Sequence, residues 1–354
     1  MKDFYKNKTV LITGHSGFKG SWLSQILINW NANVVGYSLK PPTNPNLFDL
    51  LDLHPNMISI NDDIRDLNKL MEIFDIYEPE IVIHMAAQPL VRESYKNPVY
   101  TYDTNVMGTV NICECVRKSE SVKSFLNVTT DKVYENVEKS EGYHEDEKLD
   151  GFDPYSNSKS CSELVTHSYI NSFFKNLNIP TSTARAGNVI GGGDFAKERI
   201  IPDCFRACEN HENIIIRNPY SIRPYQHVLE PLSMYLEIAK KQFINKNYSD
   251  YYNIGPNDED CIETAKLVDL FCKYFNQTNK ENIRWINKSD NGPHEANFLK
   301  LDNTKIKQTF NWKPTWNIEK AIEKTVEWIN VYLNNENITD CVNNQINEFF
   351  NKKL

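Results

Sequence analysis

The feature that most constrains this chain is a glycine-rich turn between a strand pattern and a helix pattern. Residues 8–13 (KTVLIT) form a short β-branched run, residues 14–20 (GHSGFKG) follow at once, and a helical stretch continues through Trp30. Glycines let a backbone turn tightly and approach a pyrophosphate, and the helix presents unpaired N–H groups and the positive end of its dipole. The pattern predicts a dinucleotide site, although a purely structural turn has the same spacing. The expected contacts are Gly14, Ser16, Gly17, Phe18, Lys19 and Gly20.

The rest of the first half repeats this alternation of strand and helix patterns. Strands are expected at 33–38, 81–85 and 124–129, with helices at 67–77 and 99–117. Short apolar strands that alternate with helices indicate right-handed βαβ units and a parallel sheet covered on both faces. Ligands bind such sheets at the carboxyl ends of the strands, so functional side chains are expected there.

From about Arg185 onward, loops rich in glycine, proline and charge interrupt shorter elements, as in a smaller second lobe. The predicted fold class is therefore α/β, a Rossmann-type doubly wound parallel sheet with a smaller C-terminal α/β substrate lobe. Residues 1–184 are expected to bind the dinucleotide, with a return of roughly 225–257, and residues 185–354 to form mainly the substrate lobe. Amphipathic helices are expected at 318–333 and 338–350.

Charge and composition exclude several function classes. The 354 residues carry a net charge of −8, which argues against nucleic acid or an anionic membrane as the main partner. No apolar run approaches the roughly 20 residues that span a bilayer, and the N-terminus has no signal-peptide core. The 8 cysteines include no Cys-x-x-Cys, so neither a metal site nor a disulfide framework is expected. We expect a cytoplasmic protein.

The adenosine side of the dinucleotide site lacks its usual acid. The second strand of such folds ends on an Asp or Glu that holds the ribose, but residues 36–40 read GYSLK. Ser38 could bond a ribose and Lys40 could tolerate a 2′-phosphate, so the residues alone leave NAD and NADP open. Asp63 and Ile64, after a third short strand, could edge the adenine, although a solvated acidic turn fits as well.

A tyrosine and a lysine four residues apart mark the predicted active-site helix. Asp153 can cap this helix and Pro154 suits its first turn. Residues four apart share one helical face, so Lys159 can hold its cation near the Tyr155 phenol or a cofactor ribose. A nearby positive charge lowers a tyrosine pKa, as a base that removes a hydroxyl proton requires. The alternative is an ordinary surface pair.

A polar turn follows the apolar strand at 124–129. Thr130 can hydrogen-bond a sugar hydroxyl beside Tyr155, and Asp131 is a candidate general acid for expelling a hydroxyl as water. A plain reductase does not require that acid. An ordinary cap or turn residue is the alternative for Asp131.

With these residues collected, the chain resembles the extended short-chain dehydrogenase/reductase superfamily over nearly its whole length. Within it, the chain looks like the CDP-glucose 4,6-dehydratases. The matching stretches are 13–22 (TGHSGFKGSW), 36–50 (GYSLKPPTNPNLFDL), 130–136 (TDKVYEN), 153–159 (DPYSNSK), 184–194 (ARAGNVIGGGD), 222–231 (IRPYQHVLEP) and 293–302 (PHEANFLKLD).

The resemblance implies NAD as a cofactor regenerated in each turnover. Tyr155 would take the proton of the 4-hydroxyl while C4 passes hydride to NAD. Loss of the C5 proton and the C6 hydroxyl would follow, with Asp131 protonating the departing oxygen, and hydride would return to C6. Many 4,6-dehydratases place a glutamate after the catalytic aspartate as the C5 base; here Lys132 stands there, so the C5 base stays open.

The resemblance also implies the remaining site residues and the partners. Catalytic residues would be Thr130, Asp131, Lys132, Tyr155 and Lys159, and further cofactor contacts would be Ala86, Ala87, Gln88, Asn105 and Thr129. A nucleotide-diphosphate hexose would meet Asn188, Arg199, Arg223 and His294. A homodimer or homotetramer is implied.

Two rival functions share parts of this pattern. A nucleotide-sugar 4-epimerase, or a dehydratase for another hexose nucleotide, would use the same glycine turn and Tyr155–Lys159 pair. An epimerase expels no hydroxyl, so Asp131 would be idle there. A non-catalytic dinucleotide-binding protein typically loses the Tyr–Lys pair, which this chain retains.

Overall fold

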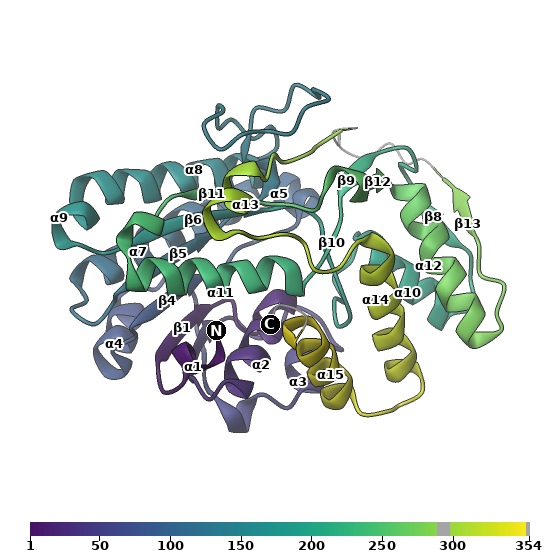
Figure 1. The fold of residues 1–354 in the computed structure, drawn as a ribbon, viewed down its shortest axis with the longest axis horizontal. Helices are drawn as coiled ribbons and strands as arrows, with labels where there is room; N and C mark the ends of the chain where they lie inside the picture. The colour runs from purple at the N-terminus through teal and green to yellow at the C-terminus, as the bar shows by residue number, and fades with distance from the viewer. Residues whose placement is uncertain (289–297, 352–354) are drawn as a thin grey trace.

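The fold is organised around a seven-stranded sheet (Figure 1). The structure is a computed structural model, and it describes residues 1–288 and 298–351. All neighbouring strands of the sheet run parallel. Their spatial order is β11 (Tyr251–Ile254), β6 (Thr181–Ala186), β5 (Ser124–Val128), β4 (Ile81–His84), β1 (Thr9–Thr13), β2 (Asn33–Ser38) and β3 (Ile58–Asn61). The order reverses beside β1, where the chain crosses from one half of the sheet to the other, and this reversal opens a crevice at the carboxyl ends of the strands.

Helices cover both faces of this sheet. α2 (Phe18–Asn29) and α11 (Leu229–Ile244) contribute to one apolar cluster. α4 (Leu67–Tyr77) and α7 (Gly108–Lys118) contribute to a second cluster on the opposite face, against which α8 (Pro154–Tyr169) also packs. Because both faces are covered, β4 (IVIH) and β5 (SFLNV) are buried at every residue and are mostly apolar. The predicted Rossmann-type fold class is confirmed.

Most predicted elements match the structure closely, with two differences. The predicted helix at 99–117 is divided into α6 (Pro98–Tyr102), a π-helical turn η2 (Asp103–Met107) and α7. Strand β6, with the sequence TSTARA, had no apolar signal and was not predicted. All six of its residues are buried because its polar groups have buried partners: Ser182 donates to Gln242 at 2.6 Å and Arg185 binds Glu163.

The smaller lobe is built from short paired strands and three helices (Figure 1). Its strand pairs are β7 (Val189–Ile190) with β10 (Gln226–His227), β9 (Ile222–Pro224) with β12 (Cys261–Glu263), and β8 (Ile214–Ile216) with β13 (Trp285–Asn287). Its helices are α10 (Ile200–Glu209), α12 (Thr264–Asn279) and α14 (Ile318–Leu333). The short elements are α1 (Lys2–Tyr5), α3 (Leu47–Leu50), η1 (His54–Asn56), α5 (Val91–Lys96), η3 (Asp131–Val133), η4 (Ile170–Phe174), α9 (Lys175–Leu177), η5 (Lys246–Tyr248), η6 (Asp258–Asp260) and α13 (Thr304–Phe310).

Two later segments return to the sheet. β11 pairs with β6, and α11 packs below it, where the Gln242 amide donates to the Phe125 carbonyl at 2.9 Å. The C-terminal helix α15 (Ile338–Asn351) lies beside α2, where Asn343 accepts from Gln25 at 3.0 Å (Figure 1). The division of the chain into a cofactor part and a substrate part stays a prediction.

Several features are missing from the part of the chain that the structure describes. Over residues 1–288 and 298–351, no helix is long and apolar enough to cross a membrane, and no group of acidic, histidine or cysteine side chains could hold a metal ion. All eight cysteines are free thiols.

Candidate active site

A large cavity opens between the carboxyl ends of the strands and the smaller lobe. It encloses about 1750 Å³ and reaches from Ser38 at the end of β2 to Arg206 on α10. Sites for one drug-sized ligand usually measure about 300–1,000 Å³. The cavity therefore has room for two ligands side by side, a dinucleotide along the sheet and a second molecule against the smaller lobe.

The glycine turn is packed as a dinucleotide cradle requires. Gly14 has φ +78°, and a Cβ there would lie 2.9 Å from the Ala86 backbone nitrogen. A Cβ on Gly20 would lie 2.2 Å from the Gly14 oxygen, so this glycine lets α2 approach the turn. A Cβ on Gly17 would meet only that oxygen, at 3.5 Å. Two glycines therefore permit the close packing of the turn, and the third leaves open space above the N-terminus of α2.

At the β2 end of the cavity, serine hydroxyls occupy the place where dinucleotide-binding folds usually have an Asp or Glu. The Ser38 hydroxyl donates to Ser16 at 2.8 Å and lies 3.0 Å from Nδ1 of His15. The His15 Nε2 lies 2.8 Å from the Ser59 hydroxyl. Burial lowers the pKa of His15 to about 4, so this chain of polar groups is neutral at physiological pH.

Asp63 and Ile64, the predicted adenine edge, line the same end of the cavity. The Asp63 carboxylate is held by Arg65 at 2.7 Å, and hydrogen bonds from Arg65 lower the pKa of Asp63. Its charge is therefore already balanced by the protein.

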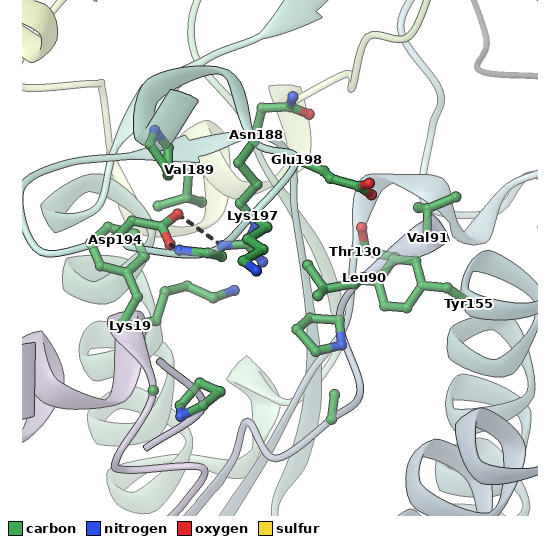
Figure 2. Close-up of a pocket in the computed structure, with 18 of the residues that line it drawn as sticks. Lys19, Leu90, Val91, Thr130, Tyr155, Asn188, Val189, Asp194, Lys197 and Glu198 are labelled. Atoms are coloured by element: carbon green, nitrogen blue, oxygen red, sulfur yellow. Dashed lines mark hydrogen bonds and ion pairs between the residues drawn. The ribbon is translucent and has the colours of Figure 1, made fainter. Parts of the chain in front are cut away.

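Tyr155 is the second residue of α8, which begins as predicted. The Asp153 side chain caps the helix by accepting from the Ser156 N–H at 3.0 Å, and Pro154 occupies the first turn. The Tyr155 ring lines the cavity beside Thr130 (Figure 2). Burial raises the pKa of Tyr155 to about 12, while hydrogen bonding to Thr130 and the charge of Arg199 act in the opposite direction. The expectation of a lowered pKa is therefore reversed, because loss of hydration dominates.

Lys159 lies deeper than the sequence argument expected. Its ammonium donates to the Val128 carbonyl at 3.1 Å, the side chain is buried, and it is not part of the cavity wall. Burial, with the charge of Lys19, lowers the pKa of Lys159 to about 7. Lys159 therefore joins the active-site helix to the end of β5 in this structure, and its predicted contact with the phenol or the ribose stays a prediction.

Asp131 presents one bound and one free carboxylate oxygen. Oδ1 accepts from the Thr130 hydroxyl at 2.9 Å and from the Lys132 ammonium at 3.1 Å. Oδ2 is buried and has no hydrogen-bond partner among the described residues. A Cβ on Gly187 would lie 2.9 Å from Oδ2, so this glycine keeps the space beside the free oxygen open. A buried acceptor without a partner is costly and calls for a ligand.

Beneath this turn lies a buried ion pair. Glu163 on α8 binds the Arg185 guanidinium on β6 at 2.6 Å and accepts from the Thr129 hydroxyl at 2.5 Å. Arg185 also donates to the Tyr134 hydroxyl at 2.6 Å. The network therefore holds Thr129 and Tyr134, the start and the end of the turn that carries Asp131. The Thr129 hydroxyl faces this network, although Thr129 still lines the cavity.

After β4, Ala86, Ala87 and Gln88 line the cavity, whereas Asn105 does not. The Asn105 amide is buried and clamps Gln88, with Oδ1 accepting from its N–H at 2.8 Å and Nδ2 donating to its carbonyl at 3.1 Å. Nδ2 also donates to Ser158 at 2.8 Å. In this structure Asn105 shapes the cavity wall from behind, and its direct contact with the cofactor stays a prediction.

Asn188, one of the predicted substrate residues, lies across the cavity from Thr130 and Tyr155 (Figure 2). Asn188, Arg199 and Arg223 all line the cavity. The Asn188 Oδ1 is buried without a hydrogen-bond partner among the residues described, and Arg199 binds Asp194 at 2.9 Å. His294 lies outside the described residues.

Sequence reasoning missed further cations of this wall, among them Arg206 and Arg217. Both are near Asp203, to which Arg206 is bound and from which Arg217 lies 4.0 Å away. Arg206 follows Arg199 by two helical turns, so the spacing of seven residues was a usable signal. Arg217 follows a short strand that has no comparable pattern.

The doubly wound sheet, the glycine cradle and the Tyr155 helix define the class of this protein, an extended short-chain dehydrogenase/reductase. A model of the GDP-mannose 4,6 dehydratase family matches residues 11–325, and the chain belongs to this family. It is 45% identical to a CDP-glucose 4,6-dehydratase of Salmonella typhimurium over 98% of both chains. It is 25% identical to a dTDP-glucose 4,6-dehydratase of Haemophilus influenzae, covering 90% of this chain and 97% of the relative.

Solved structures share the fold at lower identity. A dTDP-glucose 4,6-dehydratase from Bacillus anthracis in complex with NAD superposes with a TM-score of 0.74 at 22% identity, covering 91% of this chain and 96% of that one. A UDP-glucuronic acid 4-epimerase from Bacillus cereus, in complex with UDP-glucuronic acid and NAD, gives 0.76 at 22% identity, covering 92% and 99%.

Proposed function

We propose that this chain is a nucleotide-sugar 4,6-dehydratase that converts CDP-D-glucose to CDP-4-dehydro-6-deoxy-D-glucose and water. The observation that carries the proposal is the buried, unpartnered Oδ2 of Asp131 in the cavity wall that also holds Thr130 and Tyr155. Elimination of a hydroxyl needs an acid, whereas epimerisation does not. The 45% identity to a CDP-glucose 4,6-dehydratase favours CDP-glucose among the candidate substrates.

NAD fits the residues at the sheet side of the cavity. The open space above Gly17 and the N-terminus of α2 suit its pyrophosphate, while Ser38, Asp63 and Ile64 suit its adenosine end. When bound, NAD supplies a reversible hydride acceptor. Ala86, Ala87 and the clamped Gln88 would form the wall along its length.

Tyr155 takes the proton of the substrate's 4-hydroxyl onto its phenolic oxygen. With a pKa of about 12 in the free site, the phenol is protonated at neutral pH. Thr130 and Arg199 already stabilise the phenolate, and further positive charge close to the ring would add to their effect. When the site fills, the phenol therefore releases its own proton to solvent, and the resulting phenolate accepts the proton of the 4-hydroxyl.

Asp131 delivers a proton to the departing 6-hydroxyl through Oδ2. The hydrogen bonds from Thr130 and Lys132 both go to Oδ1, so they fix the carboxyl group without occupying its free oxygen. We propose that the role of Lys132 in the resting site is to orient the Asp131 carboxyl group. The identity of the C5 base stays open.

The opposite wall would hold the substrate's diphosphate and sugar. Arg199 and Arg223 can bind phosphate oxygens through their planar guanidinium groups. The free Asn188 Oδ1 can accept from a sugar or ribose hydroxyl. These cations also allow an acidic protein to bind an anionic substrate.

The proposal is tested by incubating the purified protein with NAD and CDP-, dTDP-, GDP- or UDP-glucose in parallel, without added reductant. We expect a 4-keto-6-deoxy sugar that absorbs in alkali, formed fastest from CDP-glucose. Absence of this product from every substrate, or build-up of one NADH per sugar, would contradict the dehydratase assignment. Faster conversion of another nucleotide sugar would contradict the choice of CDP-glucose as substrate but not the dehydratase assignment.

We also propose that the protein works in the cytoplasm as a homodimer or homotetramer. Its free cysteines suit a reducing compartment. Apolar side chains project from neighbouring helices α6 to α8, with Val99 81% exposed, Leu164 54% and Met107 47%. A surface of this kind commonly packs against a second copy. Light scattering after gel filtration gives the number of chains, and a monomeric active enzyme would contradict this assignment.

A further inference from the structure

Lys19 brings a positive charge into the cavity from the glycine turn. It lies in the first turn of α2, and its side chain reaches the cavity facing the wall that carries Asp194 and Asn188 (Figure 2). The nearby acids already have partners, because Asp131 is paired with Lys132 and Asp194 with Arg199. Lys19 itself forms no ion pair with any acidic side chain in residues 1–288 or 298–351.

The surroundings of Lys19 are more positive than negative. Arg199, from the loop before α10, disfavours the charge on Lys19, as does burial, while Asp131 after β5 favours it. The charge of Lys19 in turn acts on Lys159 of α8. From α11, the Tyr235 ring lies 5.9 Å from the Lys19 ammonium. A partly desolvated cation among other cations is unfavourable unless a bound anion balances it.

We propose that the Lys19 ammonium, together with Arg199, binds the diphosphate of the nucleotide-sugar substrate. This inference rests on the proposed function and adds a substrate-binding residue to it. A diphosphate could also belong to the cofactor, but that group has the Gly17 turn and the N-terminus of α2 to bind it. The charged groups that act on Lys19 are Arg199 and Asp131, both on the substrate and catalytic side. Lys19 therefore connects the cofactor turn to the substrate.

Binding of a diphosphate to Lys19 should be accompanied by the uptake of a proton, which can be measured. Burial and Arg199 lower the pKa of Lys19 to about 8. A diphosphate bound to the ammonium raises that pKa, so binding at a pH slightly above 8 draws a proton onto Nζ. Lys159, whose pKa is about 7, would contribute mainly at lower pH. The charged and titratable groups on the elements around Lys19 are Arg199, Asp131, Lys159 and Tyr235.

The experiment is titration calorimetry of the full-length protein with CDP and, separately, with NAD, in two buffers of different ionisation enthalpy near pH 8.5. For Lys19→Met, we expect CDP to bind about tenfold more weakly or worse, as for loss of a charged hydrogen bond, and NAD to change less than about twofold. Lys19→Arg should keep most of the CDP affinity but lose the proton uptake, because arginine does not titrate there. Lys69→Met removes one exposed surface charge and is the matched control.

Three outcomes would overturn the inference. They are unchanged CDP affinity in Lys19→Met, a larger loss for NAD than for CDP, or equal proton uptake in Lys19→Arg and the natural protein. Because the titration needs no turnover, it is independent of the proposed reaction. UDP, dTDP and GDP are titrated alongside CDP. If one of these binds best and Lys19→Met weakens it, the inference stands while the choice of CDP fails.

Discussion

At the scale of single residues, the two carboxylate oxygens of Asp131, the acid that we propose, have different surroundings. Oδ1 accepts two hydrogen bonds that hold the carboxyl group still, and Oδ2 accepts none from the described residues. Gly187 keeps the space beside Oδ2 free of side chains. The arrangement is suited to transferring one proton in one direction.

Asp131→Asn is expected to lower kcat by about 100-fold or more while CDP-glucose binding stays nearly unchanged. The amide keeps the shape of the side chain but cannot supply an acidic proton. Steady-state rates and CDP calorimetry measure the two effects. Asp150→Asn, at an exposed position, is the control. A rate within about threefold of the natural protein would remove Asp131 from the mechanism.

Tyr155→Phe is expected to abolish turnover and to leave NAD affinity within about twofold. Only the hydroxyl is lost, and the ring still fills its place in the cavity wall. Product formation and NAD titration are the measurements, with Tyr95→Phe on α5 as the control. A nearly normal rate would show that another group takes the proton.

The sequence predicts which residues gather at this site better than it predicts how they are held. Tyr155 and Asp131 follow from the capped helix and the strand end, because these features are local. Asn105 and Lys159 differ because their partners, Gln88 and the Val128 carbonyl, lie far from them in the chain. The direction of the Tyr155 pKa shift depends on burial, which no spacing reveals.

At the scale of elements, the glycine turn and α2 fit together through two contacts of different kinds. A side chain at Gly20 would collide with the turn, whereas one at Gly17 would enter open space. Gly20 therefore serves the packing of α2 against the turn, whereas Gly17 leaves space for a ligand.

Gly20→Ala is expected to lower the thermal stability of the protein, because its Cβ would lie 2.2 Å from the Gly14 oxygen. Gly17→Ala is expected to keep the melting temperature and to weaken NAD binding by about tenfold or more, since its methyl group would occupy the space left for the pyrophosphate. Melting curves and NAD titration distinguish the two. Equal effects on both measurements would contradict this division.

The elements around the turn at 129–134 explain why β6 was not predicted. β6 is buried at every residue although its sequence is TSTARA. Its Arg185 is balanced by Glu163 of α8, and such a pairing across the fold leaves no trace in a window of sequence. The strands at 81–85 and 124–129 were predicted from their apolar residues, whereas β11, the other neighbour of β6, was not predicted as a strand.

Glu163→Gln is expected to destabilise the protein by about 3–5 kcal/mol, because it leaves the buried Arg185 without its counter-charge. The double variant Glu163→Gln with Arg185→Met should recover part of this loss, since no uncompensated charge remains. Urea unfolding measures both. A double variant less stable than the single one would contradict the interpretation.

At the scale of the whole molecule, three buried histidines link stability to pH. Burial lowers the pKa of His84 and of His227 to about 3 and that of His15 to about 4. The unfolded chain, with histidine pKa values near 6.5, binds more protons than the folded one below that pH. Stability is therefore full above about pH 7 and falls as the pH decreases through this window.

Between pH 7 and pH 5, the loss should reach about 2 kcal/mol for each of these histidines. Urea unfolding at the two pH values measures it. His227→Gln should reduce the loss by about that amount whatever its effect at pH 7, because only the difference between the two pH values is compared. An undiminished loss would mean that His227 is protonated in the folded protein.

The seventh strand of the sheet has a consequence for how this chain can be divided. β11 and α11 come from residues that follow much of the smaller lobe, yet they cover the outer edge and one face of β6 and β5. A ribosome must therefore make about 254 residues before the sheet can be completed. A fragment that stops just after β6, which ends at Ala186, would leave that strand with a bare edge, which favours aggregation. To produce the dinucleotide half as an independent protein, one would have to join α11 and β11 to the end of that fragment.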